Sequence, residues 1–133
     1  MLVQTGLTWF DGSPEGEAQL QSAIDVALWF KAHLSVASVS YIPEFRPSAQ
    51  YTPERIVLRM QAVKEALDRT RLVFARLDAQ DVPGVAFPFV TTRKNFKRQF
   101  KGLSRCADII VQSETLRLIE DRASPFGAQK MTA

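Results

Sequence analysis

The first residues that could do chemistry are Asp11 and Gly12, which lie between an apolar segment and the start of a helix. Open α/β sheets bind their ligands in the crevice outside the carboxyl ends of parallel strands, and a residue that directly follows a strand stands there. Asp11-Gly12-Ser13-Pro14 is also typical of an ordinary turn between a strand and a helix. The two interpretations are compatible, and Asp11 is therefore a candidate ligand-binding residue that also makes a turn.

A second candidate group consists of basic side chains in a segment that has no acid: Arg93, Lys94, Lys97, Arg98, Lys101 and Arg105. Such a cluster could contact several phosphates, with an affinity that falls as salt is added. Phe96 and Phe100 lie on the opposite face of the expected helix, so no aromatic ring stands among the basic residues. A solvated helix surface is the commoner explanation, and nucleic-acid or anion binding by residues 93–105 is the weaker alternative. Arg93 and Lys94 are separate candidates for a phosphate contact.

Several site classes are excluded by composition. His33 is the only histidine and Cys106 the only cysteine, which excludes histidine triads, sites with several histidines and internal disulfides. No apolar run approaches the roughly 18 residues of a membrane span. Met1–Phe10 lacks the basic region that opens an export signal. We therefore expect a cytoplasmic protein that holds no metal and does not enter a membrane.

Two helices begin with nearly the same residues, Ser13-Pro14-Glu15 and Thr52-Pro53-Glu54. In each, a hydroxyl can cap the first amides, proline presets the backbone, and the acid meets the positive end of the helix dipole. Apolar residues follow the second start for about seven turns at three- and four-residue steps. They predict the core-facing side of that helix: Ile56, Met60, Val63, Leu67, Phe74 and Leu77.

Short apolar runs separate the helices, and the basic segment is expected to form a third helix. The predicted strands are Leu2–Thr8, Leu34–Val39, Val85–Val90 and Asp108–Gln112. Strict alternation of strands and helices implies right-handed crossovers and an open parallel sheet with helices on both faces, an α/β fold of three layers. Pro88 cannot donate a hydrogen bond to a neighbouring strand, which places the third strand at an edge of the sheet.

Three segments carry a resemblance to a known family: Asp11-Gly12-Ser13, Lys31-Ala32-His33-Leu34 and Arg105–Val111. In this order and spacing they resemble the universal stress proteins, over residues 2–113. The resemblance implies a sheet of order 3-2-1-4-5, in which strand three lies at an edge, as Pro88 requires. It also implies that Asp11 lies beside the nucleotide in those members of the family that bind one.

The segment after the fourth strand departs from the family pattern. Nucleotide-binding members carry a glycine-rich loop there, whose backbone amides hold the phosphates. This chain continues Gln112-Ser113-Glu114, and Gly127 is its only glycine after Gly102. No apolar run predicts a fifth strand. We therefore expect a universal-stress-protein-like domain at residues 1–113, with sheet order 3-2-1-4, and an atypical segment at 114–133.

These observations lead to a non-catalytic stress-response domain with weak or no ATP binding and no other cofactor. The fourth strand, Asp108–Gln112, would be an open edge, and proteins rarely leave such an edge bare. We accordingly predict a homodimer, or a tandem partner domain, joined along that strand. The alternative is an adenine-nucleotide-binding protein that uses Asp11, Gly12, Val39, Ser40 and a phosphate contact from Arg93 or Lys94.

Overall fold

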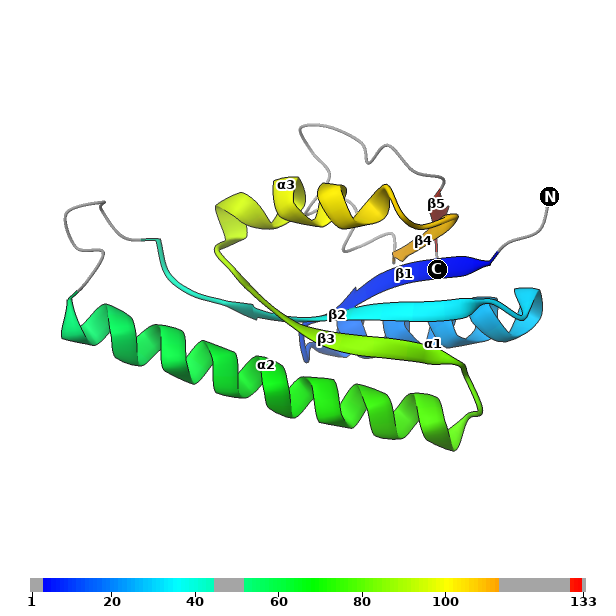
Figure 1. Ribbon diagram of the computed structural model, residues 1–133, viewed down its shortest axis with the longest axis horizontal. Coiled ribbons are helices and arrows are strands. Elements are labelled where there is room, and N and C mark those ends of the chain that lie inside the picture. The colour runs from blue at the N-terminus through cyan, green and yellow to red at the C-terminus, as the bar shows by residue number, and fades with distance from the viewer. Residues whose placement is uncertain (1–3, 45–51, 113–129, 133) are drawn as a thin grey trace.

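The computed structural model describes residues 4–44, 52–112 and 130–132 (Figure 1). Strands and helices alternate as the sequence predicts. The elements in chain order are β1 Thr5–Phe10, α1 Pro14–Phe30, β2 His33–Tyr41, α2 Pro53–Ala79, β3 Gly84–Thr91, α3 Arg93–Ser104, β4 Ile109–Gln112 and β5 Lys130–Thr132.

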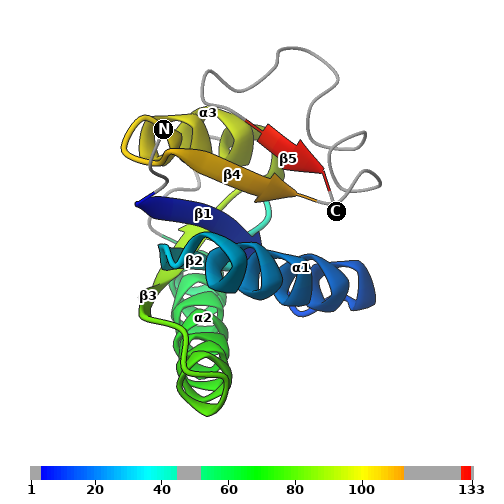
Figure 2. The ribbon, with the colours of Figure 1, turned by 90° about the vertical axis from the view of Figure 1, so that its right-hand side faces the viewer.

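All strand pairs are parallel, and the sheet has the order β3-β2-β1-β4-β5. Helices α1 and α2 cover one face, and α3 covers the other (Figures 1 and 2). The predicted α/β fold of three layers is confirmed, and so is the predicted strand order β3-β2-β1-β4 within the sheet. Pro88 lies in the edge strand β3, also as predicted. No helix in the described parts of the chain is long and apolar enough to cross a membrane.

The prediction that a fifth strand is missing is wrong. Strand β5 comes from the same chain and pairs with β4, with Ile110 opposite Lys130 and Gln112 opposite Thr132. Strand β4 therefore has β1 on one side and β5 on the other, so Asp108–Gln112 is not the open edge through which a partner was expected to bind. The sequence hid β5 because strand pairing uses backbone amides and carbonyls, which any short segment can supply without an apolar run. The expected loss of the glycine-rich loop concerns residues outside the described ranges.

The predicted helix starts are confirmed in atomic detail. The Ser13 hydroxyl accepts a hydrogen bond from the Gly16 amide at 2.9 Å, and the Thr52 hydroxyl accepts one from Arg55 at 3.4 Å. Thr92 caps α3 in the same way, with the Asn95 amide at 3.1 Å. Each cap satisfies an amide that the helix itself leaves without an acceptor.

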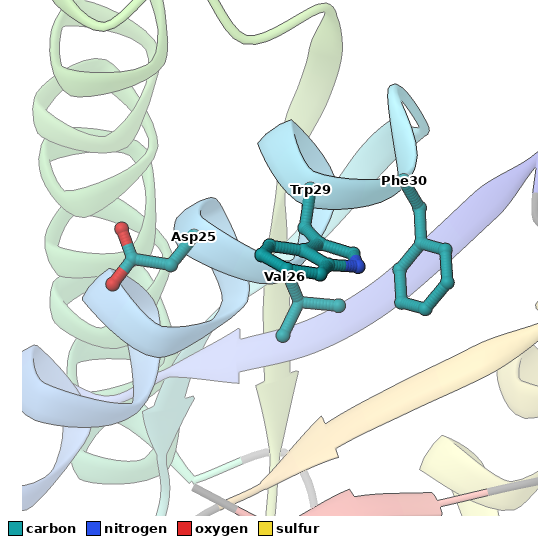
Figure 3. Close-up of a pocket in the computed structure, with 4 residues that line it drawn as sticks. All are labelled: Asp25, Val26, Trp29 and Phe30. Atoms are coloured by element: carbon teal, nitrogen blue, oxygen red, sulfur yellow. The ribbon is translucent and has the colours of Figure 1, made fainter.

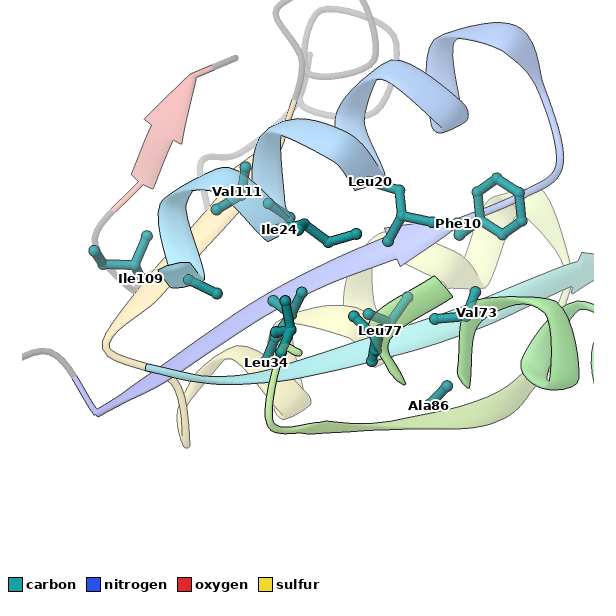
Figure 4. Close-up of a cluster of buried hydrophobic side chains, with 13 residues drawn as sticks. Phe10, Leu20, Ile24, Leu34, Val73, Leu77, Ala86, Ile109 and Val111 are labelled. Atoms are coloured by element: carbon teal, nitrogen blue, oxygen red, sulfur yellow. The ribbon is translucent and has the colours of Figure 1, made fainter. Parts of the chain in front are cut away.

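Each face of the sheet has its own core. Under α1 and α2, side chains such as Leu20, Ile24 and Leu34 pack together with residues from β1, β3 and β4 (Figure 4). On the α3 face, the core is aromatic and centres on Phe96, which is fully buried. Its ring lies 5.4 Å from Trp9 and Phe100 and 6.0 Å from Tyr41 and Phe89, measured between centroids.

The predicted core face of α2 is largely wrong. Of the predicted residues only Leu77 is buried, whereas Met60 is 66% exposed and Ile56 is 49% exposed. The sheet instead receives a row of mostly smaller side chains: Ala62, Ala66, Thr70, Val73 and Leu77. Small side chains let the helix backbone approach the sheet closely, so the larger apolar residues beside them remain at the surface.

Asp108 joins the start of β1 to the start of β4. Its Oδ2 accepts hydrogen bonds from the amides of Gln4 at 2.8 Å and Thr5 at 2.9 Å. These two backbone bonds hold the pKa of the Asp108 carboxyl below its usual value, against a smaller opposing effect of desolvation.

A pH dependence of stability follows from this lowered pKa. The carboxylate stabilises the fold at every pH above the pKa that Asp108 has in the unfolded chain, and this contribution is lost as the pH falls through its folded pKa. We expect Asp108→Asn to lower the free energy of unfolding at neutral pH, measured by urea denaturation. The deficit should shrink in acid, where wild-type Asp108 is also neutral. A deficit that stays constant down to the lowest pH at which the fold survives would contradict the assignment.

Candidate functional site

The site predicted from the sequence lies at the carboxyl ends of β1 and β2. Strand register places Phe10 opposite Ser38, so Asp11 and Gly12 leave β1 beside the stretch of β2 that contains Val39 and Ser40. The structure therefore brings these four predicted cofactor-binding residues to one edge of the sheet, and Arg93, which follows the end of β3, stands at the same edge. Their role in binding a cofactor stays a prediction.

Asp11 is already engaged within its own turn. Its Oδ1 accepts hydrogen bonds from the Ser13 amide at 3.0 Å and from the Ser13 hydroxyl at 2.6 Å. The same hydroxyl accepts the bond from Gly16 that caps α1. Gly12 has a φ of +83°, a conformation that glycine adopts at little cost. This geometry matches the turn interpretation, in which Asp11 orients the residue that caps the helix.

The residue that sequence reasoning missed is Arg69, which comes from α2 and lies outside the face of that helix that was predicted to be buried. Its Nη1 donates hydrogen bonds to the Val39 carbonyl and to the Ser40 hydroxyl, both at 2.7 Å. Its Nε would lie 2.9 Å from a Cβ placed on Gly12. Arg69 thus crosses the crevice from the end of β2 to the turn after β1.

One sequence signal could have revealed Arg69. It stands one residue before Thr70, at the border of the small-residue row that faces the sheet. A long cationic side chain at such a border can run along the sheet and reach the ends of the strands. The interpretation of Ile56, Met60 and Phe74 as the buried face put Arg69 on the wrong side of the helix.

Arg69 brings a positive charge to the carboxyl edge of the sheet, between the end of β2 and the turn after β1. Within residues 4–44, 52–112 and 130–132, no carboxylate oxygen lies within 4.0 Å of the Arg69 guanidinium. Its described partners are a carbonyl and a hydroxyl, which leave the cation uncompensated by an adjacent anion. A ligand at Val39 or Ser40 would have to share these acceptors with Arg69 or displace it.

Arg93, the fifth predicted residue, lies on the other face of the sheet. Its guanidinium stacks over the Tyr41 ring at 4.1 Å, and Tyr41 belongs to the aromatic core under α3. Arg93 thus stands on the α3 side of the carboxyl edge, whereas Arg69 reaches that edge from α2 on the other side, and a phosphate contact by Arg93 stays a prediction. Lys94, Arg98 and Lys101 are exposed on α3, and nucleic-acid binding by this helix stays an untested prediction.

Gln112 is a second polar group that the sequence did not single out as a binding residue. It ends β4 at the carboxyl edge of the sheet and is fully buried, and neither polar atom of its carboxamide has a hydrogen-bond partner among the residues that the structure describes. Most buried polar side chains find such a partner. An unsatisfied carboxamide at the ligand-binding edge of an α/β sheet is a group that a bound molecule could satisfy.

Two of the pockets among the described residues lie beside α1 and at the end of α3, away from this crevice. One of about 310 Å³ is formed beside α1 by Asp25, Val26, Trp29 and Phe30, and the Trp29 side chain stands at its rim, 83% exposed (Figure 3). Another, of about 360 Å³, lies at the carboxyl end of α3 and includes the exposed Cys106. Neither contains a residue predicted to bind a ligand. In the described ranges, no three His, Cys, Asp or Glu side chains are grouped to hold a metal ion.

No protein-family model matches the sequence, and no curated protein is significantly similar to it. Solved structures are similar in fold. A universal stress protein family member from Burkholderia pseudomallei has 18% identity and a TM-score of 0.68, covering 99% of this chain and 96% of its own. UspA from Lactobacillus plantarum has 14% identity and a TM-score of 0.70, covering 99% of this chain and 98% of its own.

A third similar structure is a universal stress protein in complex with cAMP, with 17% identity and a TM-score of 0.62; the alignment covers 100% of this chain and 98% of that one. These identities are low, and the likeness extends over nearly the whole of each chain. It includes the sheet order that the resemblance in the sequence implied. The chain therefore has the fold of the universal stress proteins.

Proposed function

We propose that this protein is a non-catalytic, universal-stress-protein-like domain that acts in a stress response by binding a partner or a second copy of itself, with weak or no binding of ATP. Arg69 is the observation that carries this proposal. Its hydrogen bonds to Val39 and Ser40 occupy the acceptors that a nucleotide would need, and its Nε lies against Gly12.

The positions of the reactive side chains support a non-catalytic role. His33 begins β2 and Cys106 precedes β4, so both stand at the amino ends of the strands. Parallel sheets bind and transform their ligands at the carboxyl ends. The side chains best suited to acid–base or nucleophilic catalysis are thus at the opposite edge from the crevice.

The alternative is a nucleotide-binding protein with an unusual phosphate contact. A protein of this fold has been solved with cAMP, and at the same edge of the sheet the buried carboxamide of Gln112 lacks a partner within the described part of the chain. In this alternative Arg69 would contact a phosphate instead of closing the crevice, because a guanidinium binds phosphate well. The two functions therefore assign opposite roles to one side chain.

Replacing Arg69 by alanine distinguishes the two proposed functions. We expect millimolar AMP, cAMP or ATP, with and without magnesium, to leave the melting temperature of the wild type unchanged. Arg69→Ala should open the crevice, so that a nucleotide now raises the melting temperature. A ligand at a hundredfold excess over its Kd stabilises a protein by about 2.7 kcal/mol.

Arg71→Ala is the matched control, because Arg71 is exposed on the same helix and pairs only with Asp68 among the described residues. It should behave as the wild type. A nucleotide that stabilises the wild type and loses its effect in Arg69→Ala would establish the alternative.

A further inference from the structure

One side of α2 carries a continuous row of exposed apolar side chains, here called the α2 stripe: Ile56, Val57, Met60, Val63, Leu67 and Phe74. Met60 is 66% exposed, and none of the six is less than 39% exposed. Single exposed apolar residues need no explanation, but a contiguous row of this length is typical of an interaction surface.

The stripe lies in a corner between α2 and the edge of the sheet. Arg76 bonds to Glu17 and Gln21 and so marks the side of α2 that faces α1. At about 100° of rotation per residue, the stripe lies roughly opposite this side and about a quarter turn from the buried row. It therefore lies on the side of α2 that points past the edge strand β3. Figure 2 shows α1 and β3 on opposite sides of α2.

The spacing of the stripe fits another helix. Ile56, Met60, Val63 and Leu67 are separated by four, three and four residues, the alternation that places apolar side chains along the seam of two packed helices. Pro88 interrupts the donors of β3, so an added strand is a poorer fit at this edge.

The charges that border the stripe indicate what that helix carries. Arg59, Lys64 and Arg71 flank it and are exposed. If two copies of the stripe packed on each other, these like charges would come together and repel. A partner helix with Asp and Glu at the same positions would attract them instead. Arg71 has one described acidic partner, Asp68 at 3.2 Å, and that exposed pair remains open to exchange.

We propose that the α2 stripe docks an amphipathic helix of a partner protein, one whose apolar residues follow the same spacing and are flanked by Asp and Glu. This proposal rests on the partner-binding half of the proposed function and supplies it with a surface. The stripe runs from Ile56 to Phe74 and spans about 27 Å, at 1.5 Å per residue. That is long enough for a partner helix to bury five or six apolar residues at its seam positions.

The test uses the full-length chain and a synthetic helical peptide with leucine at the seam positions and glutamate beside them. The peptide should bind the wild type in a fluorescence anisotropy titration. Met60→Glu should weaken binding at least about tenfold, since a central apolar contact commonly contributes more than the 1.4 kcal/mol of that factor. Leu72→Glu is the control: Leu72 is on the same helix, is also 66% exposed, and lies outside the stripe. It should change affinity less than about twofold, well below that factor of ten.

Four results would overturn the proposal. The first is failure of the glutamate peptide to bind. The second is equal binding by a peptide with lysine in place of glutamate. The third is a homodimer in light scattering that Met60→Glu dissociates, which would make a second copy the occupant. The fourth is binding to phosphatidylglycerol vesicles that Met60→Glu abolishes. No nucleotide is used in these measurements. The stripe can therefore fail to bind the peptide while Arg69 still prevents nucleotide binding, and Arg69 can fail its own test while the stripe still binds the peptide.

Discussion

Replacing Phe96 by alanine is expected to lower the free energy of unfolding by roughly 3–5 kcal/mol. The ring is fully buried and makes four aromatic contacts, with Trp9, Tyr41, Phe89 and Phe100. Its removal would take away the centre of the core that joins α3 to the sheet. Three of the neighbouring rings belong to β1, β2 and β3, whose backbones are held by the strand ladder, and Phe100 belongs to α3 itself, so the strand rings could not collapse into the space.

Urea denaturation followed by tryptophan fluorescence would measure this loss, because Trp9 lies in the affected cluster with its centroid 5.4 Å from Phe96. Phe74→Ala is the control, since the same side chain is removed from a position that is 44% exposed on α2. It should cost no more than about 1 kcal/mol, the usual scale for a point substitution that leaves no cavity. Similar losses in the two variants would show that Phe96 is not the centre of this core.

The order of the elements could be predicted because each has a local physical cause. Ser13 and Thr52 cap helices whichever fold surrounds them, and Pro88 weakens any interior strand in which it is placed. Alternation of strands and helices then restricts the topology. Phe96 and Phe100 were also assigned correctly to the buried side of α3, since the basic residues left that helix only one apolar face.

The buried face of α2 could not be predicted in the same way. Two neighbouring rows on this helix are free of charge for much of its length, one of large side chains such as Met60 and one of small ones such as Ala62 and Ala66. Hydrophobicity favours the large row, whereas close packing of a helix on a sheet favours the small one. The small row is the one that packs on the sheet. Which row packs there depends on the surface of the sheet, and the local sequence of the helix does not contain that information.

The candidate site was predicted only in part for a related reason. Asp11 and Val39 reach one edge because the topology demands it, and the sequence contains that topology. Arg69 reaches the same edge from a different element, across a distance set by how α2 lies on β2. Strand β5 was missed because its pairing depends on backbone groups, about which the side chains of Lys130–Thr132 carry little information.

Gly84→Ala is expected to destabilise the protein by about 3 kcal/mol or more, at the upper end of what a forced extra carbon costs in a packed interior. A Cβ at this position would lie 2.2 Å from the carbonyl oxygen of Leu34. That oxygen belongs to the backbone of β2, which is paired to β1 on its other side, with Gly6 opposite Leu34. To relieve this clash, the edge strand β3 would have to move away from β2. Its hydrogen bonds to β2 would then weaken from the first residue of the strand onward.

Gly102→Ala is the same substitution at another position, and we expect it to change the stability of the protein in the opposite direction. Gly102 lies inside α3, and nothing in the described structure stands within 4 Å of its added Cβ. Alanine there should stabilise the protein by about 0.5–1 kcal/mol, because glycine loses more backbone freedom when a helix forms. Chemical denaturation of the two variants beside the wild type would measure both effects. If Gly84→Ala were neutral, β2 and β3 could not approach as closely as Leu34 and Gly84 do here. The placement of α2 over both strands, and of Arg69 with it, would then have to be revised.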